Sequence, residues 1–333
     1  MKKNIFSLSI FSFIILLGCA KASKKVLLIF SYHPEYSWVV EQTRGVEDIL
    51  KDKVYNQENE AIIQNSKYKI EKFYLDTKRN TSAEWKTEIS EKAVEKINEF
   101  KPDIVIVFDD NACELVAKQY IGKKLPFVFC GMNGEPSDYG FPAENITGVI
   151  ERLHINESYH LLKQILPDVE KIAFITDNSI TSQKIVSRIN KVDFPAEISE
   201  IFTINDLDEW KTKIKDFQTN VDAIGIILYH TIKEDGKRIP SEEVINWTLE
   251  NNQLAEFVFW DFVIADGAFC GVTISGYEQG KAAAEIAKRI LNGEKPSDIQ
   301  ISRENVIIPM INLERAKQLN LKIDKEILKK YGS

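Results

Sequence analysis

The sequence predicts an α/β protein of two Rossmann-like lobes, each built on a parallel sheet. Short apolar runs that are typical of buried strands alternate with amphipathic stretches at helical spacing along most of the chain. That alternation indicates a parallel sheet covered by helices on both faces. The chain has 333 residues, more than one hydrophobic core usually supports, so we expect two such sheets.

The first half of the chain predicts a regular order of elements. Trp85, Ile89, Ala93 and Ile97 recur at the spacing of one helix face. The polar segment 52–67 is predicted to be a loop or an insertion. Strands are expected at 25–31, 68–76, 102–108 and 125–131, and helices near 37–51, at 82–100 and at 111–120.

The second half repeats the pattern. The segment "NGEKP" after residue 291 combines a glycine stop with a proline just beyond it, which ends a long helix. Strands are expected at 146–152, 170–176, 196–204, 221–229, 256–260, 270–274 and 305–311, and helices at 155–166, 180–191, 206–217, 241–252 and 277–292.

The N-terminus has the features of a secretory signal. Lys2 and Lys3 precede an apolar stretch that is too short to favour a retained transmembrane helix. The stretch ends in Leu16-Leu17-Gly18-Cys19, which resembles the bacterial lipobox, so we expect Cys19 to carry lipid. A plain signal peptide with an incidental cysteine is the alternative. Residues 1–18 are then the signal peptide and residues 19–24 a tether to the membrane.

Charge and cysteine content narrow the function classes. The net charge is −7, and removal of Lys2 and Lys3 with the signal makes it −9. No basic cluster or motif indicates nucleic-acid binding. Cys113, Cys130 and Cys270 show no zinc spacing and are too few for a disulfide scaffold, although export would permit one bridge. We expect no metal and no cofactor.

Each predicted strand ends in polar or aromatic residues. Ligands bind outside the carboxyl ends of the strands in open parallel sheets, so two facing sheets would enclose a cleft lined by these ends. The segment "SYHPEYSW" (31–38), after the first strand, is therefore expected to form one wall of a ligand cleft. The candidate ligand-binding residues are Ser31, Tyr32, His33, Trp38, Asp109, Asp110, Asn111, Asn133, Asp177, Asn178, His230, Trp260, Asp261 and Thr273.

These candidates have structural alternatives. Tyr32 and Trp38 could stack on a flat ligand, or Trp38 could only cover the strand end. His33 could donate to an anion or hold its own loop. At least one residue of Asp109-Asp110-Asn111 should cap the following helix, which leaves another aspartate for an ammonium or hydroxyl group.

The remaining strand ends have similar alternatives. Asp177-Asn178-Ser179 also stands between a predicted strand and a predicted helix, like Asp109-Asp110-Asn111. One of its residues is expected to cap the helix, and another could contact the ligand. The segment 76–79 could be a turn with a solvated basic edge, or it could contact the ligand directly. No arginine other than Arg79 stands at the strand ends, so a ligand carboxylate would depend on Ser, Thr or backbone N–H donors.

Nothing in the sequence favours catalysis. The chain has no nucleophile elbow, phosphate loop, zinc-protease motif or dinucleotide fingerprint. His154 and His160 are six residues apart, which places them on different faces of a helix. His33 and Asp109 could form an acid/base pair, but no nucleophile motif stands beside them.

Five segments carry a resemblance to a known family. "SYHPEYSW" with Arg44-Gly45, "LDTKR", "DDNA", "FCGMN" and "GYEQGKAAAEIAKRILNGEKPSDI" are similar to ABC-transporter substrate-binding proteins of the type I periplasmic-binding fold, a group that includes extracytoplasmic sensor domains. The resemblance covers roughly residues 24–312. It implies two lobes joined by a hinge of three crossings, near 147–151, 268–273 and 299–305. The implied limits are 25–147 plus 273–299 for the first lobe, 148–272 plus 300–320 for the second, and 321–333 for a C-terminal tail.

The resemblance also implies a function. We expect an extracytoplasmic, lipid-anchored and monomeric protein that captures a small polar or aromatic, amino-acid-like solute for an ABC permease. The alternative is a sensor that reports the same ligand to a membrane signalling protein, and an exported enzyme is the third possibility. No residue identifies the ligand.

Overall fold

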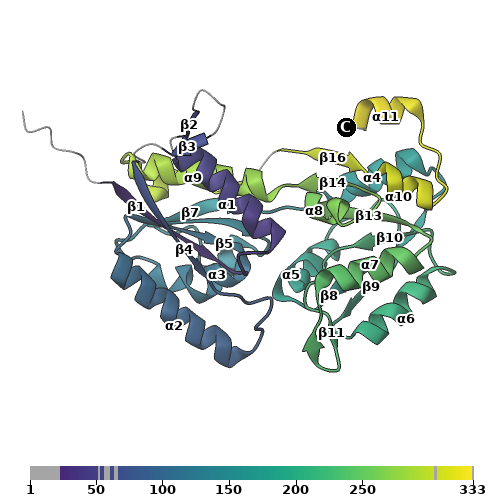
Figure 1. The fold of residues 1–333 in the computed structure, drawn as a ribbon, viewed down its shortest axis with the longest axis horizontal. Helices are drawn as coiled ribbons and strands as arrows, with labels where there is room; N and C mark the ends of the chain where they lie inside the picture. Colours follow the sequence, from purple (N-terminus) through teal and green to yellow (C-terminus); the bar gives the residue numbers. More distant parts are fainter. Residues whose placement is uncertain (1–22, 52, 56–60, 64–66, 304–305, 332–333) are drawn as a thin grey trace, which may run out of the picture.

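Two α/β lobes lie side by side in the computed structural model, which describes residues 23–51, 53–55, 61–63, 67–303 and 306–331 (Figure 1). Each lobe is built on a six-stranded sheet. Two short antiparallel hairpins, β2 (Lys53–Tyr55) with β3 (Ala61–Ile63) and β11 (Lys233–Glu234) with β12 (Lys237–Arg238), lie outside these sheets. The first hairpin falls in the segment 52–67, which the sequence predicts to be a loop or an insertion.

The first sheet is entirely parallel. Every residue of its strand Ile104–Phe108 is buried, and alternate side chains of that strand belong to two separate core clusters. Burial on both faces requires helices on both faces. In spatial order the strands are β15 (Ser302–Arg303), β7 (Ile146–Ile150), β6 (Phe127–Met132), β5 (Ile104–Phe108), β1 (Lys24–Phe30) and β4 (Tyr68–Tyr74).

Helices cover this sheet on both sides. One core cluster joins the sheet to α1 (Ser37–Leu50) and α9 (Gly276–Leu291), and the other joins it to α2 (Ala83–Phe100) and α3 (Asp109–Leu115). The predicted helix at 111–120 is α3 followed by a separate 3-10 turn, η1 (Ala117–Tyr120). Two further 3-10 turns are η2 (Pro136–Tyr139) and η3 (Pro296–Asp298).

α1 and α9 pack closely because two glycines lie at their contact. A Cβ atom on Gly280 would lie 2.0 Å from the carbonyl oxygen of Gln42, and one on Gly45 would lie 2.1 Å from the carbonyl oxygen of Tyr277. Only residues without a side chain allow the two backbones to approach this closely. α9 thus belongs to the first lobe, although it follows the second-lobe strands in sequence.

The second sheet is parallel except for its last strand, which runs antiparallel to its neighbour. In spatial order its strands are β16 (Ile308–Ile311), β14 (Cys270–Ile274), β13 (Ala255–Trp260), β10 (Ala223–Ile226), β8 (Lys171–Asp177) and β9 (Glu197–Ile204). The associated helices are α4 (Ile155–Ile165), α5 (Ile180–Ile189), α6 (Leu207–Phe217), α7 (Ser241–Asn251) and α8 (Asp261–Ala265).

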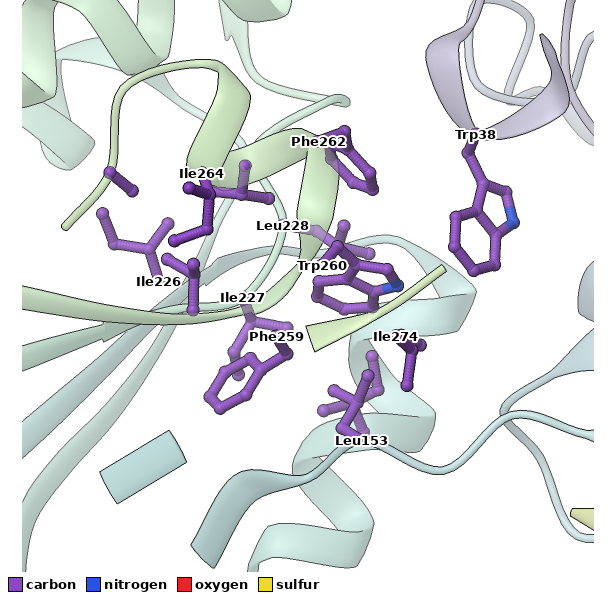
Figure 2. Close-up of a cluster of buried hydrophobic side chains, with 14 of the residues drawn as sticks. Trp38, Leu153, Ile226, Ile227, Leu228, Phe259, Trp260, Phe262, Ile264 and Ile274 are labelled. Atoms are coloured by element: carbon purple, nitrogen blue, oxygen red, sulfur yellow. The ribbon is translucent and has the colours of Figure 1, made fainter. Parts of the chain in front are cut away.

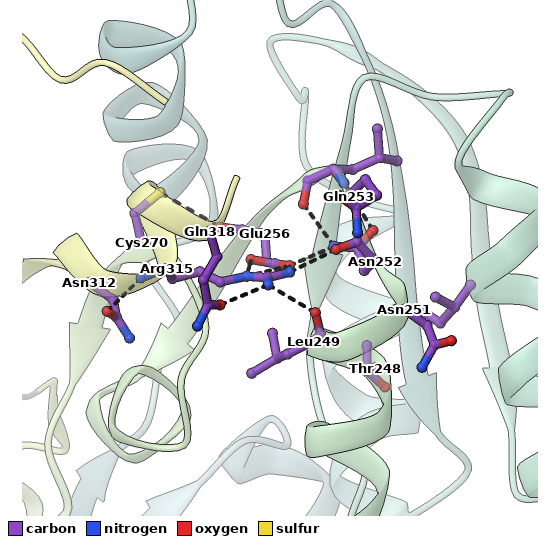
Figure 3. A network of polar contacts seen from close by, with 12 residues as sticks. Thr248, Leu249, Asn251, Asn252, Gln253, Glu256, Cys270, Asn312, Arg315 and Gln318 are labelled. Atoms are coloured by element: carbon purple, nitrogen blue, oxygen red, sulfur yellow. Dashed lines mark hydrogen bonds and ion pairs between the residues drawn. The ribbon is translucent and has the colours of Figure 1, made fainter. Parts of the chain in front are cut away.

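The C-terminal segment packs on the second lobe through α10 (Leu313–Gln318) and α11 (Lys325–Tyr331). Arg315, in α10, is 4% exposed and forms an ion pair with the buried Glu256 of β13 (Figure 3). Its guanidinium also donates to the carbonyl oxygens of Leu249 (2.8 Å) and Asn252 (3.0 Å). Side chains of α11 pack against the main core, so the residues that the sequence analysis assigned to a tail include a docked helix.

Strand pairing locates the passages between the lobes. The chain leaves the first sheet after Ile150, returns after Ile274, and leaves again after Arg303. The sequence-based limits placed residues 300–303 in the second lobe, but β15 pairs with β7 of the first sheet. A polar strand of two residues has no periodicity that would reveal this pairing.

Several expectations concern residues outside the described part of the chain. The signal peptide and Cys19 lie there, so the structure says nothing of either.

Cys113, Cys130 and Cys270 are buried free thiols. Among the described residues, no helix has the length and apolar character needed to cross a membrane, and no group of three or more His, Cys, Asp or Glu residues could hold a metal ion.

Candidate functional site

The carboxyl ends of the strands meet between the two lobes. In the first sheet β1, β5 and β6 are in register, so Phe30, Phe108 and Cys130 lie side by side and the residues after them share one edge. The Tyr32 hydroxyl reaches the other lobe, where it lies 3.0 Å from the Thr181 hydroxyl of α5. The two strand-end surfaces are therefore in direct contact.

Aromatic rings from both lobes meet at this contact. Phe262, at the start of α8, has Tyr36, Trp38 and Trp260 around it, with ring centroids 5.8, 6.4 and 6.0 Å away. Figure 2 shows Trp38 projecting from α1 toward Phe262 and Trp260 of the second lobe. Tyr36 also meets the ring of His230 edge-on at 4.9 Å.

These rings surround a small cavity that we call the inner chamber. Its volume is about 20 Å³, enough for roughly one water molecule. The residues that line it are Tyr32, Tyr36, Trp38, Lys78, Asp109, Asn133, Glu151, Thr181, Leu228, Trp260 and Phe262.

Asp109 places one unpartnered carboxyl oxygen at this chamber. Its backbone has a φ of 66°, a left-handed conformation that is uncommon outside glycine. Its Oδ1 atom accepts from the Trp38 indole N–H (3.0 Å), whereas Oδ2 is buried and has no hydrogen-bond partner among the described residues. Burial raises the pKa of Asp109 well above its usual range.

Glu151 is the second buried carboxyl group of the inner chamber. It follows β7 at the first passage between the lobes and is 1% exposed. Its Oε1 atom accepts from the Trp260 indole N–H at 3.1 Å, so each tryptophan orients one acid. Burial raises the pKa of Glu151 to about 8.

Lys78 is the buried cation of the site. It is 3% exposed, and its Nζ atom lies 4.4 Å from the centroid of Tyr32 and 5.1 Å from that of Tyr36. Among the described residues its ammonium forms no hydrogen bond or ion pair, so the two rings are its main contacts. Burial lowers the pKa of Lys78.

Five of the residues predicted from sequence line the inner chamber: Tyr32, Trp38, Asp109, Asn133 and Trp260. Four others lie close by. His230 contacts Tyr36, and burial lowers the pKa of His230 well below its usual range. Burial also lowers the pKa of His33 to about 4. Asn111 and Asn178 line a neighbouring cavity.

The other predicted residues have structural partners. Ser31 bonds to the first turn of α3, because its Oγ accepts from the backbone N–H of Ala112 (2.8 Å) and donates to the carbonyl of Phe108 (2.6 Å). The expectation that Asp109, Asp110 or Asn111 caps this helix was wrong, since the helix begins at Asp109 and its N-cap residue is Phe108, whose side chain makes no capping hydrogen bond. Asp110 instead accepts from the N–H of Gly134 (2.8 Å) and from the Tyr139 hydroxyl (2.6 Å).

Three of the predicted residues in the second lobe, Asp177, Asp261 and Thr273, also have hydrogen-bond partners within the protein. Asp177 accepts from the Ser182 hydroxyl (2.6 Å) and the N–H of Thr231 (3.0 Å). Ser179 caps α5 through the N–H of Ser182. Asp261 accepts from the N–H of Phe262, and Thr273 donates to the carbonyl of Ile308.

Sequence reasoning missed six lining residues: Tyr36, Lys78, Glu151, Thr181, Leu228 and Phe262. Glu151 follows a buried strand, as the predicted residues do, and that signal could have identified it. Lys78 stands among charged residues, and its burial became visible only once the lobes were in contact.

Residues 37–333 match the model of the family described as ABC transporter substrate binding protein. No curated protein matches the chain. The fold is similar to that of a domain from Streptococcus pneumonia solved in complex with L-Trp, with 18% identity and a TM-score of 0.70 over 93% of this chain and 99% of that chain.

Two further structures are similar. A ligand-free, open substrate-binding protein with adhesive properties from Clostridium difficile has 15% identity and a TM-score of 0.63 over 91% of this chain and 96% of that chain. A transcription regulator of Lactococcus lactis has 13% identity and a TM-score of 0.54 over 85% of this chain and 97% of that chain. At these identities the similarity establishes the fold, a two-lobed type I periplasmic-binding-protein-like architecture.

Proposed function

This chain belongs to the ABC transporter substrate-binding protein family, and from that membership we propose that it captures a small solute with an amino group and a flat apolar part, such as an aromatic amino acid. Proteins of this family bind a solute for an ABC transporter and do not transform it. The proposal concerns the class of solute, the place where it is bound and the anchor of the protein.

The arrangement of Asp109 and Glu151 carries the proposal. Both carboxyl groups are buried at the inner chamber, and neither has a lysine or arginine within ion-pair distance among the described residues. A buried carboxyl group without a cation keeps its proton because its ionised form is costly, and a ligand ammonium would favour that ionised form and supply the missing charge and hydrogen bonds. Trp38, Trp260 and Phe262 offer aromatic surface for the rest of such a ligand.

Entry of the solute requires the lobes to separate. A volume of about 20 Å³ holds roughly one water molecule, far less than an amino acid. Opening would break contacts between the lobes such as that of Tyr32 with Thr181, and the ligand would replace them. The L-Trp complex of a protein with the same fold supports an aromatic amino acid as the first probe.

A thermal-shift screen of amino acids, nucleosides and sugars tests the proposal. A ligand at a hundred times its dissociation constant should add about 2.7 kcal/mol to the free energy of unfolding. We expect aromatic amino acids to stabilise the wild type and the Asp109→Asn variant to respond less, because the amide cannot balance an ammonium. Stabilisation by sugars or phosphorylated compounds alone would contradict the proposed solute class.

The proposed role includes a lipid anchor at Cys19 and delivery to an ABC importer outside the cytoplasm. The lipobox-like Leu16-Leu17-Gly18-Cys19 supports the anchor. Cys19→Ala should release the protein from the membrane fraction or leave it unprocessed, as immunoblotting of fractions would show. A Cys19→Ala protein that matures and stays with the membrane like wild type would refute the anchor.

A further inference from the structure

A second cavity adjoins the inner chamber, and we call it the outer chamber. Its volume is about 150 Å³, and residues of both lobes line it. Tyr32, Lys78 and Thr181 line both chambers, so the two spaces share a wall. One small solute can therefore reach both once the lobes have closed around it.

The charged side chains that line the outer chamber are all positive. Lys78, Lys86 and Lys233 line it, and no aspartate or glutamate is among its lining residues. Among the described residues, none of these three ammonium groups forms an ion pair. In a chain with a net charge of −7, three unpaired lysines around one cavity indicate an electrostatic preference for an anion.

Asp177, an acidic residue whose charge acts on Lys78, is already occupied by hydrogen bonds. Asp177 lies at the base of α5, and its carboxylate accepts from the Ser182 hydroxyl and from the N–H groups of Ser179 (3.1 Å) and Thr231. It therefore has little capacity left to bind the Lys78 ammonium, which lies over Tyr32 and Tyr36 instead.

The N-terminus of α5 adds a second attraction for anions. Ser179, Ile180 and Thr181 form part of the chamber wall. The first N–H groups of a helix have no acceptor within the helix, and the helix dipole places partial positive charge there. The unpartnered, almost fully buried Lys78 lines the same space, so two independent features favour the same kind of ligand group.

We propose that the outer chamber binds an oxyanion group of the captured solute, a carboxylate in the simplest case, through Lys78, Lys86, Lys233 and the N-terminus of α5. This inference rests on the proposed function and narrows it, because a solute with its amino group in the inner chamber and its acid group in the outer one is an amino acid rather than an amine. It also replaces the sequence-based expectation that a carboxylate would depend on Ser, Thr or backbone donors alone.

Simple anions test the chamber without knowledge of the natural ligand. Acetate, sulfate and inorganic phosphate, each compared with chloride at constant ionic strength, should raise the melting temperature of the purified protein. Lys86→Met and Lys233→Met should weaken binding of the effective anion about tenfold. Lys124→Met, which removes an exposed lysine outside the chamber, should bind it like wild type. The strongest of the three anions indicates whether the site suits a carboxylate or a tetrahedral group.

Equal anion binding by all four proteins, or no stabilisation by any of the three anions, would overturn the inference. A comparison of L-tryptophan with tryptamine separates this result from failure of the proposed function. If tryptamine binds as well as L-tryptophan and the lysine variants bind both like wild type, the outer chamber is no acid site while the proposed function stands. The opposite result is also informative. If L-tryptophan, tryptamine and the other compounds of the thermal-shift screen all fail to bind, but the simple anions bind and the lysine variants weaken that binding, then the outer chamber is an anion site and the proposed solute class is wrong.

Discussion

Glu151 connects the chemistry of the site to the stability of the protein. Its carboxyl group is buried against Trp260, and burial raises its pKa to about 8 from its ordinary value of 4.5. Below pH 4.5 the group is protonated in the folded and the unfolded chain alike. Between about 4.5 and 8 the unfolded chain releases the proton while the folded chain keeps it, so the free energy of unfolding falls as pH rises.

Glu151→Gln should remove this pH dependence. The amide keeps the indole hydrogen bond but has no proton to release, so the variant should gain stability relative to wild type as pH rises from 4.5 to 8, on the order of a few kcal/mol. Urea unfolding at several pH values measures the difference, with the exposed Glu99→Gln as control. A wild type and a Glu151→Gln protein with parallel pH profiles would show that Glu151 is ionised in the folded, ligand-free state.

The close contact between helices α1 and α9 fixes the position of Trp38, which lies on α1. Trp38 and Gln42 lie on α1, and the Gln42 carbonyl is the atom that a Cβ at Gly280 would meet at 2.0 Å. Gly280→Ala should push the helices apart and lower the free energy of unfolding by about 1–3 kcal/mol, as urea denaturation would show. Glu285→Ala, on the exposed face of α9, should change it little. An unchanged midpoint for Gly280→Ala would mean that the two helices can separate freely.

Most elements could be predicted from sequence because buried strands leave continuous apolar runs. Residues 24–30 and 104–108 are of this kind, and each is followed by a residue that the structure places at the inner chamber, Tyr32 and Asp109. Lys78 was not predicted, since its burial depends on the other lobe and no local pattern encodes it. Glu151 directly follows the buried strand β7, and that position could have identified it. β15 and the antiparallel β2–β3 hairpin were missed because strands of two or three residues are too short to show a periodicity.

At the scale of the whole molecule, the structure is a closed form whose lobes are joined by polar contacts. Lys184 of α5 forms an ion pair with Asp138 of the first lobe at 2.7 Å, and Arg188 of the same helix donates to the carbonyl of Asn133. Such contacts exist only when the lobes are together, so they bias the equilibrium between open and closed forms.

Arg188→Met should shift this equilibrium toward the open form. We expect a larger radius of gyration than wild type in small-angle scattering without ligand, and weaker binding of any solute that needs the closed form. Lys191→Met, at an exposed position just after α5, is the matched control. Saturating ligand should reduce the radius of gyration of the variant, and an unchanged value would count against closure of the lobes around the solute.

Calorimetric titration of an aromatic amino acid tests the central claim, that one solute is held between the lobes by groups of both. Trp38→Ala removes a ring of the first lobe and Phe262→Ala a ring of the second. The account predicts that each variant weakens binding about tenfold or more while the stoichiometry stays at one, because the ligand loses a stacking surface in either case. Binding of the same amino acid by either variant with the affinity of wild type would contradict it.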